Sequence, residues 1–177
     1  VKLELRKKNK KIKIKTPKIG VLIETPAAAL ISESLAKNCD FFAIGTNDLT
    51  MYTLAIDRGD EEVAKIYDPG HLSVLKLIEM SAKSATRNKI PISVCGEMAG
   101  DTLFTSMLIG MGIRTLSMST SRILRVKQFL SNVSVTEVKK ISDDILKEND
   151  NVLIKSLLNN YYNKINLRIK TRKNGWF

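Results

Sequence analysis

Cysteine and histidine are scarce in this chain of 177 residues, which contains two cysteines and one histidine. Two cysteines are too few for a disulfide scaffold, and a single histidine leaves no histidine–cysteine cluster for zinc. A bound metal ion is therefore expected to be a hard cation held by oxygen atoms. Cys39 comes just before an apolar segment and is interpreted as a packing residue.

Long apolar runs are also missing. No uninterrupted apolar stretch approaches the roughly 20 residues that span a bilayer, so no membrane span is expected. The first residues lack the apolar segment and the cleavage site of a secretory signal, which predicts a cytoplasmic protein. A length of 177 residues allows a real core but is short for a closed eight-stranded α/β barrel, which usually takes about 250.

Acidic residues are rare at both ends of the chain, although the net charge is +11 overall. Residues 1–18 hold nine Lys and Arg against Glu4 alone, and residues 164–177 hold five with no acid. The ends therefore carry +8 and +5, which leaves −2 for the remainder. A nucleic-acid reader should carry its basic stripe on the folded surface, so nucleic-acid binding is not expected. The alternative left open is that the tails bind nucleic acid or an anionic membrane.

The hydrophobic pattern alternates between strands and helices, which is typical of a parallel α/β fold. Four strands are predicted, at residues 19–24, 40–45, 91–95 and 115–119. Helices are predicted after each of them and toward the C-terminus, at residues 27–37, 49–56, 71–89, 102–112, 122–130, 134–148 and 152–165. Ser134 and Glu137 have the spacing of a capping box. Residues 1–18 are interpreted as an edge strand or a disordered lead-in.

Polar residues follow three of the predicted strands at the point where each strand ends. Glu24 closes the first strand, Asn47 and Asp48 follow the second, and Cys95 closes the third. In parallel α/β folds the segments after the strands lie on one face, where ligands bind. The sequence thus predicts that these four residues share one rim.

Glu24 and Asp48 together offer two hard oxygen ligands for a Mg²⁺ ion bound to a phosphate. A lone carboxylate at the end of an apolar strand costs several kcal/mol to bury unless a cation or hydrogen bonds offset it. The alternatives are that Glu24 caps the helix starting near Pro26 and that Asp48 caps the helix at 49–56.

Three further side chains have two interpretations each. Arg58 either pairs with a neighbouring aspartate or holds a phosphate through two parallel hydrogen bonds. Cys95 is either a small buried thiol or, if exposed, a proton donor or nucleophile. His71 is interpreted as a surface residue or a helix cap.

Three motifs in order carry a resemblance to a known family: GVLIETPAAAL, FFAIGTNDLTMYTLAIDRGD and PISVCGEMAGD. Over residues 19–132 the chain resembles the phosphoenolpyruvate-binding domain of enzyme I of the sugar phosphotransferase system, the phosphoenolpyruvate–protein phosphotransferase, including its nitrogen-related paralogue. Pyruvate phosphate dikinase and phosphoenolpyruvate synthase are relatives with similar motifs. The runs TLAIDRG and GEMAGD favour enzyme I.

The resemblance implies a fold and a role for each rim residue. The fold would be the C-terminal half, the last four strands, of a (β/α)₈ TIM-type barrel with trailing helices. Glu24 and Asp48 would coordinate Mg²⁺. Asn47 and Arg58 would hold the phosphate of the substrate beside Asp48. Cys95 would protonate the enolate carbon as pyruvate forms.

The resemblance also implies partners and a division of the chain. Residues 1–18 would be a basic lead-in, 19–132 a partial barrel domain, and 133–177 C-terminal helices with a basic tail. The first half of the barrel and the phosphohistidine domain are expected to be missing. The chain would then need a separately encoded N-terminal half or a second copy of itself, and a phosphocarrier protein of the HPr type. Alone it is expected to be inactive, and the alternative is a non-catalytic remnant or a dimerisation module.

Overall fold

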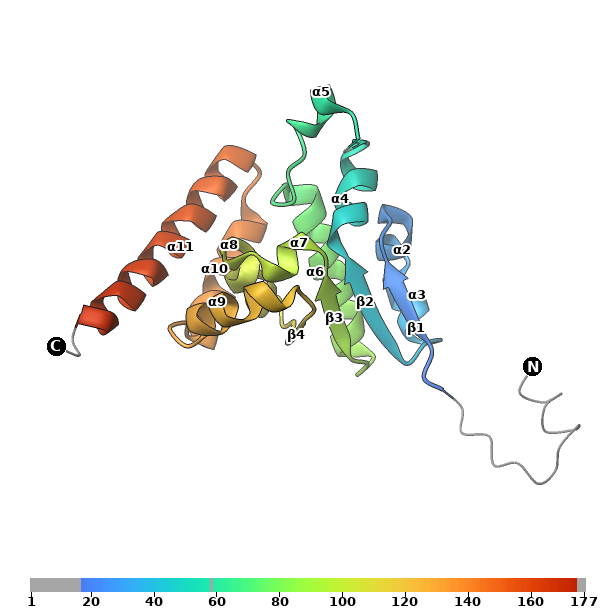
Figure 1. Ribbon diagram of the computed structural model, residues 1–177. Helices are drawn as coiled ribbons and strands as arrows, with labels where there is room; N and C mark the ends of the chain where they lie inside the picture. The colour runs from blue at the N-terminus through green and yellow to red at the C-terminus, as the bar shows by residue number, and fades with distance from the viewer. Residues whose placement is uncertain (1–16, 58, 175–177) are drawn as a thin grey trace, which may run out of the picture.

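The computed structural model describes residues 17–57 and 59–174, which form a four-stranded parallel sheet with helices packed against it (Figure 1). The strands follow one another across the sheet in chain order. They are β1 (Gly20–Ile23), β2 (Phe41–Gly45), β3 (Ile92–Cys95) and β4 (Thr115–Leu116). The predicted α/β class, with four parallel strands and trailing helices, is confirmed. The predicted edge strand or lead-in at residues 1–18 lies almost entirely outside the described residues.

Helices connect the strands and continue after the last one. Between the strands lie α2 (Pro26–Leu30), α3 (Ser32–Ala36), α4 (Thr46–Leu54), α5 (Glu61–Ala64), α6 (Leu72–Arg87), α7 (Glu97–Gly100) and α8 (Thr102–Gly110). The trailing helices are α9 (Thr120–Leu130), α10 (Val135–Lys147) and α11 (Asn151–Asn174). None of the helices in the described part of the chain has the length and apolar content that a membrane span requires.

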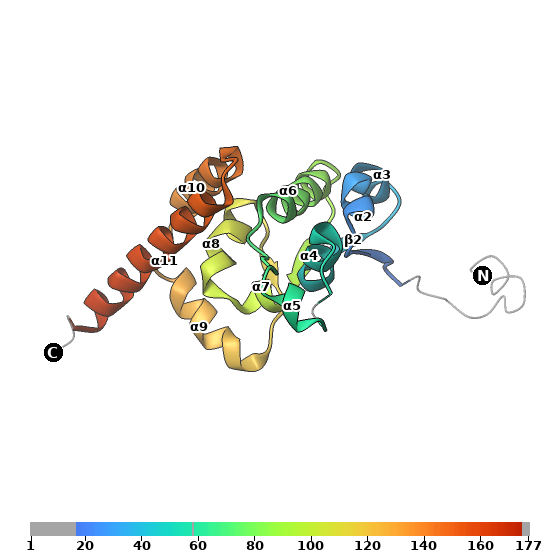
Figure 2. The same ribbon diagram turned by 90° about the horizontal axis from the view of Figure 1, so that it is seen from above.

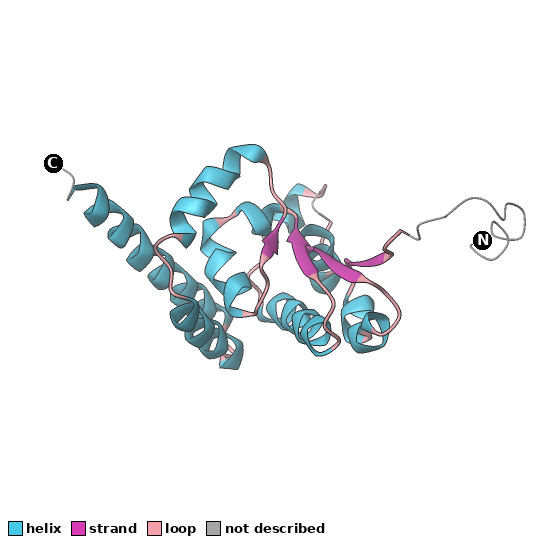
Figure 3. Ribbon diagram, turned by 90° about the horizontal axis from the view of Figure 1, so that it is seen from below, coloured by secondary structure: helices cyan, strands magenta, loops and turns pink. Residues whose placement is uncertain are grey.

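One face of the sheet is buried beneath helices. Side chains alternate along a strand, so Ile23 points to the opposite face from Leu22. Ile23, Phe42 and Val94 are fully buried in the main core together with residues of α6, whereas Leu22 is 49% exposed. Figure 2 shows α2, α3 and α6 side by side, and Figure 3 shows the four strands next to one another. The second face of the sheet is therefore the more open one.

The helix α6 is amphipathic and packs its apolar face into the main core beneath the sheet. Its buried stripe includes Val74, Leu75 and Ile78, which recur at the spacing of one helix face. His71 precedes the helix, and its Nδ1 accepts a hydrogen bond from the Ser73 backbone nitrogen at 3.3 Å. The interpretation of His71 as a helix cap is confirmed.

The trailing helices form a second apolar cluster against α8. Phe129 of α9 and Val138 of α10 lie in this cluster with residues of α11, and the ring of Phe129 stacks on that of Tyr162 with centroids 6.0 Å apart. Gly110 of α8 makes the close approach of α10 possible. A Cβ atom at Gly110 would lie 2.5 Å from the Val138 carbonyl oxygen.

Several strand and helix limits differ from the predicted ones. The strand predicted at 115–119 ends at Leu116. One further main-chain hydrogen bond follows it, from the Ser117 nitrogen to the Val94 carbonyl oxygen at 2.8 Å. The helix predicted at 49–56 begins at Thr46. Asp48 therefore lies inside the first turn of α4, and its interpretation as the cap is wrong.

The predicted capping box at Ser134 is also wrong. Ser134 makes no side-chain capping bond. The Glu137 carboxylate accepts hydrogen bonds from Lys164 at 2.8 Å and Arg168 at 2.9 Å instead. Tertiary partners on α11 thus outcompete the local bond to the backbone. The last helix reaches Asn174, well beyond the predicted end at 165.

Candidate functional site

The predicted rim residues lie at one edge of the sheet, where β1, β2 and β3 end. Glu24 follows β1 directly, Asn47 and Asp48 lie in the first turn of α4 immediately after β2, and Cys95 is the last residue of β3. The strand register places Gly45 opposite Cys95. We call Glu24, Asn47, Asp48 and Cys95 the carboxyl-end rim.

The Glu24 and Asp48 carboxyl groups are close neighbours. Burial raises the pKa of Glu24, and the negative charge of Asp48 and a side-chain hydrogen bond with Asp48 raise it further. The predicted alternative role of Glu24, as the cap of the helix near Pro26, is wrong. Thr25 caps that helix through its Oγ1, which accepts from the Ala28 nitrogen at 3.2 Å. Glu24 is therefore available for another role.

Gly45 provides the space in which the Glu24 side chain lies. A Cβ atom at Gly45 would be 2.7 Å from Glu24 Oε1 and 2.8 Å from its Cγ. Any larger residue would therefore displace the Glu24 carboxylate. The glycine at the end of β2 and the acid at the end of β1 thus form one structural unit.

The Cys95 thiol lies within electrostatic reach of both carboxylates. Its Sγ donates a hydrogen bond to the Ile44 carbonyl oxygen at 3.3 Å. Burial raises the pKa of Cys95, and the charges of Glu24 and Asp48 raise it as well. The thiol is therefore protonated near neutral pH, which suits a proton donor better than a thiolate nucleophile.

Asn47 is fixed by the backbone of the next strand–helix connection. Its Oδ1 accepts a hydrogen bond from the Glu97 nitrogen at 3.1 Å, which leaves the amide NH₂ group to face a ligand. Thr46 Oγ1 donates to the Cys95 carbonyl oxygen at 2.9 Å. Gly96 has a φ of +94°, and a Cβ there would lie 2.5 Å from Thr46 Oγ1, so this crossing requires glycine.

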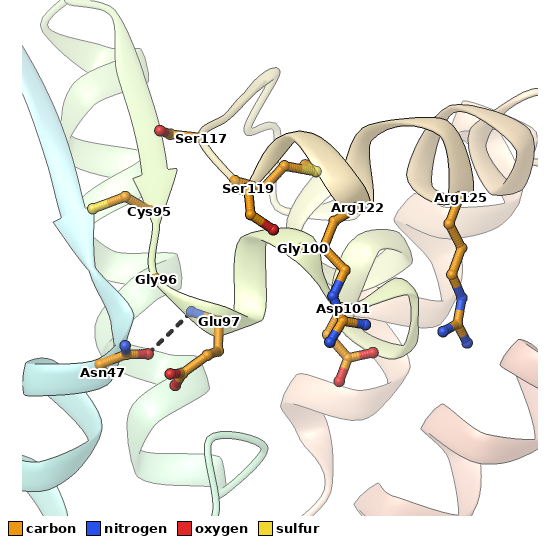
Figure 4. Close-up of a pocket in the computed structure, with 11 residues that line it drawn as sticks. Asn47, Cys95, Gly96, Glu97, Gly100, Asp101, Ser117, Ser119, Arg122 and Arg125 are labelled. Carbon is orange, nitrogen blue, oxygen red and sulfur yellow. Dashed lines mark hydrogen bonds between the residues drawn. The ribbon is translucent and has the colours of Figure 1, made fainter.

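An open pocket of about 750 Å³ adjoins the carboxyl-end rim (Figure 4). Asn47 and Cys95 line one side of it, and Arg122 and Arg125 of α9 line the other. Arg125 Nη2 donates a hydrogen bond to the Tyr162 hydroxyl at 2.9 Å, so α11 holds this arginine. The complete lining is Asn47, Cys95, Gly96, Glu97, Gly100, Asp101, Ser117, Met118, Ser119, Arg122 and Arg125.

Sequence reasoning missed the far side of this pocket. The hydrophobic pattern predicts a strand that includes Ser117 and Ser119, and it marks Arg122 and Arg125 only as part of a helix. Because the strand ends at Leu116, both serines follow a strand end, where ligands bind in parallel α/β folds. The run of small polar residues before Arg122 is the signal that could have revealed this.

The donor set of the carboxyl-end rim fits a hard cation. Among the described residues no group of three or more His, Cys, Asp or Glu side chains gathers in a way that could hold a metal. Glu24 and Asp48 alone supply two carboxylates, a set that suits Mg²⁺, which keeps waters and takes substrate oxygens. The negative charge of Asp48 raises the pKa of Glu24. The same repulsion between the two acids favours a cation between them. Arg58 lies outside the described residues.

Comparisons with known proteins place the chain beside a family of enzymes. Residues 1–135 match the family model "PEP-utilising enzyme, PEP-binding domain". Three curated relatives are named phosphoenolpyruvate-protein phosphotransferase. That of Buchnera aphidicola subsp. Acyrthosiphon pisum is 42% identical over 163 residues, which are 92% of this chain and 28% of the relative.

The second relative, from Cupriavidus necator, is 44% identical over 133 residues, or 75% of this chain and 23% of the relative. The third, from Haemophilus influenzae, is 42% identical over 150 residues, or 82% of this chain and 26% of the relative. The chain thus spans about a quarter of the length of the curated relatives it matches.

Proposed function

Because the chain belongs to the PEP-utilising enzymes, we propose that it supplies part of the phosphoenolpyruvate (PEP) site of a PEP–protein phosphotransferase. Such an enzyme transfers the phosphoryl group of PEP to a protein histidine and releases pyruvate. The observation that carries this proposal is the pairing of Glu24 with Asp48 at the carboxyl ends of β1 and β2. Two adjacent carboxylates next to a polar pocket suit a substrate that arrives with a divalent cation.

Glu24 and Asp48 would hold Mg²⁺ and keep it at the edge of the pocket. When bound, the ion would supply screening of the negative charge on the transferring phosphoryl group. The Asn47 amide, oriented by its bond to the Glu97 nitrogen, would donate a hydrogen bond to a phosphate oxygen. Arg58 is assigned the same task from the sequence, because a guanidinium binds phosphate through two bonds.

Cys95 would supply the proton that completes the reaction. When the bond between phosphorus and the enol oxygen breaks, the phosphoryl group passes to the acceptor nitrogen and the electron pair stays on the enolate. The methylene carbon then takes a proton from the Cys95 thiol, which gives pyruvate and a thiolate that regains its proton from solvent. A raised pKa keeps this thiol loaded at neutral pH.

The four parallel strands would form the last four strands of a (β/α)₈ barrel. The open face of the sheet supports this arrangement. Leu22 on that face is half exposed, and the strand register puts Cys95 on the same face. The remaining strands would come from polypeptide outside these 177 residues or from a second copy. We expect the chain alone to bind substrate weakly and to transfer no phosphoryl group.

Nuclear magnetic resonance (NMR) tests this function without requiring turnover. PEP added with Mg²⁺ to the ¹⁵N-labelled chain should shift the amide signals of Asn47, Cys95 and Gly96, and should do so less without Mg²⁺. The Glu24→Gln variant should lose the Mg²⁺-dependent part. Asp144→Asn, an exposed acid on α10, is the matched control and should respond like the wild type. A folded chain with no shift at the carboxyl-end rim would overturn the proposal.

A second candidate is a non-catalytic interaction module. Exposed apolar side chains near the open edge of β1 favour it: Ile19 is 65%, Leu30 64% and Ile31 56% exposed. Contiguous exposed apolar surface commonly marks a protein interface. A well-folded chain that ignores PEP and Mg²⁺ but associates with itself in sedimentation experiments would favour this module over the PEP site.

A further inference from the structure

A second pocket, of about 480 Å³, lies at the opposite end of the sheet from the carboxyl-end rim. Four cationic residues line it: Lys83 and Arg87 of α6, Arg114, and Lys139 of α10. Arg87 is the last residue of the helix that leads into β3, and Arg114 directly precedes β4, so the pocket lies where strands begin. We call these four side chains and the space between them the basic pocket.

No acidic side chain is among the described residues that line the basic pocket. Lys83 and Arg87 each have an acidic partner outside it. Lys83 Nζ lies 2.6 Å from Glu79, and Arg87 Nη2 lies 2.9 Å from Glu33. These pairs hold the two cations in place but leave the pocket itself lined by one sign of charge.

Arg114 is fixed by main-chain groups. Its Nη1 donates hydrogen bonds to the carbonyl oxygens of Ile109 at 2.7 Å and Ile113 at 3.0 Å. The guanidinium therefore closes the C-terminal end of α8, where carbonyl groups lack helical partners. Within the described part of the chain, the Arg114 Nη2 and Nε atoms donate no hydrogen bond, so they can face a ligand. A guanidinium that is already held in position loses little conformational entropy when it binds an anion.

The remaining wall of the basic pocket is apolar. Ile109 and Met111 at the end of α8 line it together with Val135 at the start of α10, whose side chain is 58% exposed. Gly112 also lines it, and a Cβ atom there would meet nothing within 4 Å, so this side is open. The volume falls within the range of small-molecule sites, about 300–1,000 Å³. The pocket thus combines cations on its walls with an apolar surface large enough for a small organic group.

We propose that the basic pocket binds a small organic anion that carries a dianionic group, such as a phosphate, on an apolar body. Four cations from three segments of the chain suit a group with more than one negative charge, and a guanidinium matches phosphate geometry. The apolar wall takes the body of the ligand out of water. The pocket shares no lining residue with the pocket beside the carboxyl-end rim, so a ligand here would not occupy the proposed PEP site.

Phenyl phosphate is the probe that tests this chemistry, with inorganic phosphate and phenol as its two halves. In NMR titrations of the full chain, phenyl phosphate should shift the amides of Gly110, Gly112 and Lys139 and bind more tightly than either half. Lys139→Glu should weaken its binding about tenfold, since two units of charge change at contact distance. Lys140→Glu, the neighbouring exposed residue outside the pocket, should change it less than about twofold.

Three results would overturn the proposal. One is the absence of shifts at Gly110 and Gly112. Another is equal binding by the Lys139→Glu and Lys140→Glu variants, which would indicate a general response to net charge. The third is binding of phenyl phosphate no tighter than that of inorganic phosphate, which would rule out the apolar contribution. None of these results depends on Glu24 or Asp48, so failure here is distinct from failure of the PEP site.

Discussion

Replacement of Glu137 by glutamine should destabilise the protein at neutral pH and leave it unchanged in strong acid. The carboxylate accepts three hydrogen bonds across the interface between α10 and α11. Lys164 Nζ is 2.8 Å from Oε1, and Arg168 donates through Nη1 to Oε2 at 2.9 Å and through Nη2 to Oε1 at 3.1 Å. These bonds lower the pKa of Glu137 from 4.5 to about 2, and those from Arg168 have the largest effect.

The size of the effect follows from this pKa and from exposure. A shift of one unit corresponds to about 1.4 kcal/mol, which sets a ceiling of about 3 kcal/mol for Glu137. Its side chain is 23% exposed, but those of Lys164 and Arg168 are 57% and 41% exposed, so solvent screens the pairs. The expected loss of unfolding free energy is therefore about 1–2 kcal/mol at pH 7.

The sign of the pH dependence is fixed by the direction of the shift. Because the folded-state pKa of Glu137 is depressed, its stabilising contribution is complete above the unfolded value of 4.5 and is lost as pH falls toward 2. Urea unfolding, followed by circular dichroism at pH 7, 4 and 2, measures the difference in unfolding free energy between the wild type and Glu137→Gln. Asp144→Asn on the same helix is the control. A difference that persists unchanged at pH 2, or one below about 0.3 kcal/mol at pH 7, would refute the reasoning.

Two glycine substitutions test the close approaches on which the fold depends. Gly45→Ala should push the Glu24 carboxylate aside and remove most of the Mg²⁺-dependent NMR response, at a stability cost of about 1–3 kcal/mol; an unchanged response would contradict the role of this space. Gly110→Ala should cost about 1–3 kcal/mol in urea unfolding, because the new methyl group meets the rigid Val138 carbonyl. Gly112→Ala is its control, with a φ of +93° and open space, and should cost about 1 kcal/mol. Equal costs at both positions would show that helix contact plays no part.

The strand-end residues were predictable because a single physical rule governs them. Glu24 stands out since a carboxylate at the end of an apolar strand needs a partner, and parallel strands bring their ends to one edge. The structure places the Asp48 carboxylate beside it. Cys95 followed from the same rule, although the two acids whose charges act on it lie on other segments far away along the chain.

The parts that sequence reasoning missed depend on tertiary partners. Ser134 and Glu137 have the spacing of a capping box, but nothing in their local sequence reveals that Arg168 lies 31 positions away and within hydrogen-bonding distance of Glu137. Local propensity sets what a segment can do, and the neighbours in space decide which option is realised.

The trailing helices contribute to the pocket as well as to the core. Arg125 reaches the pocket lining from α9, and its partner is the Tyr162 hydroxyl of α11. Tyr162 itself stacks on Phe129, which belongs to the cluster that α8, α10 and α11 form together. A guanidinium held by a packed aromatic residue has fewer orientations than a free one, so it loses less entropy when an anion binds. The helices after β4 therefore fix the orientation of a cation opposite Asn47.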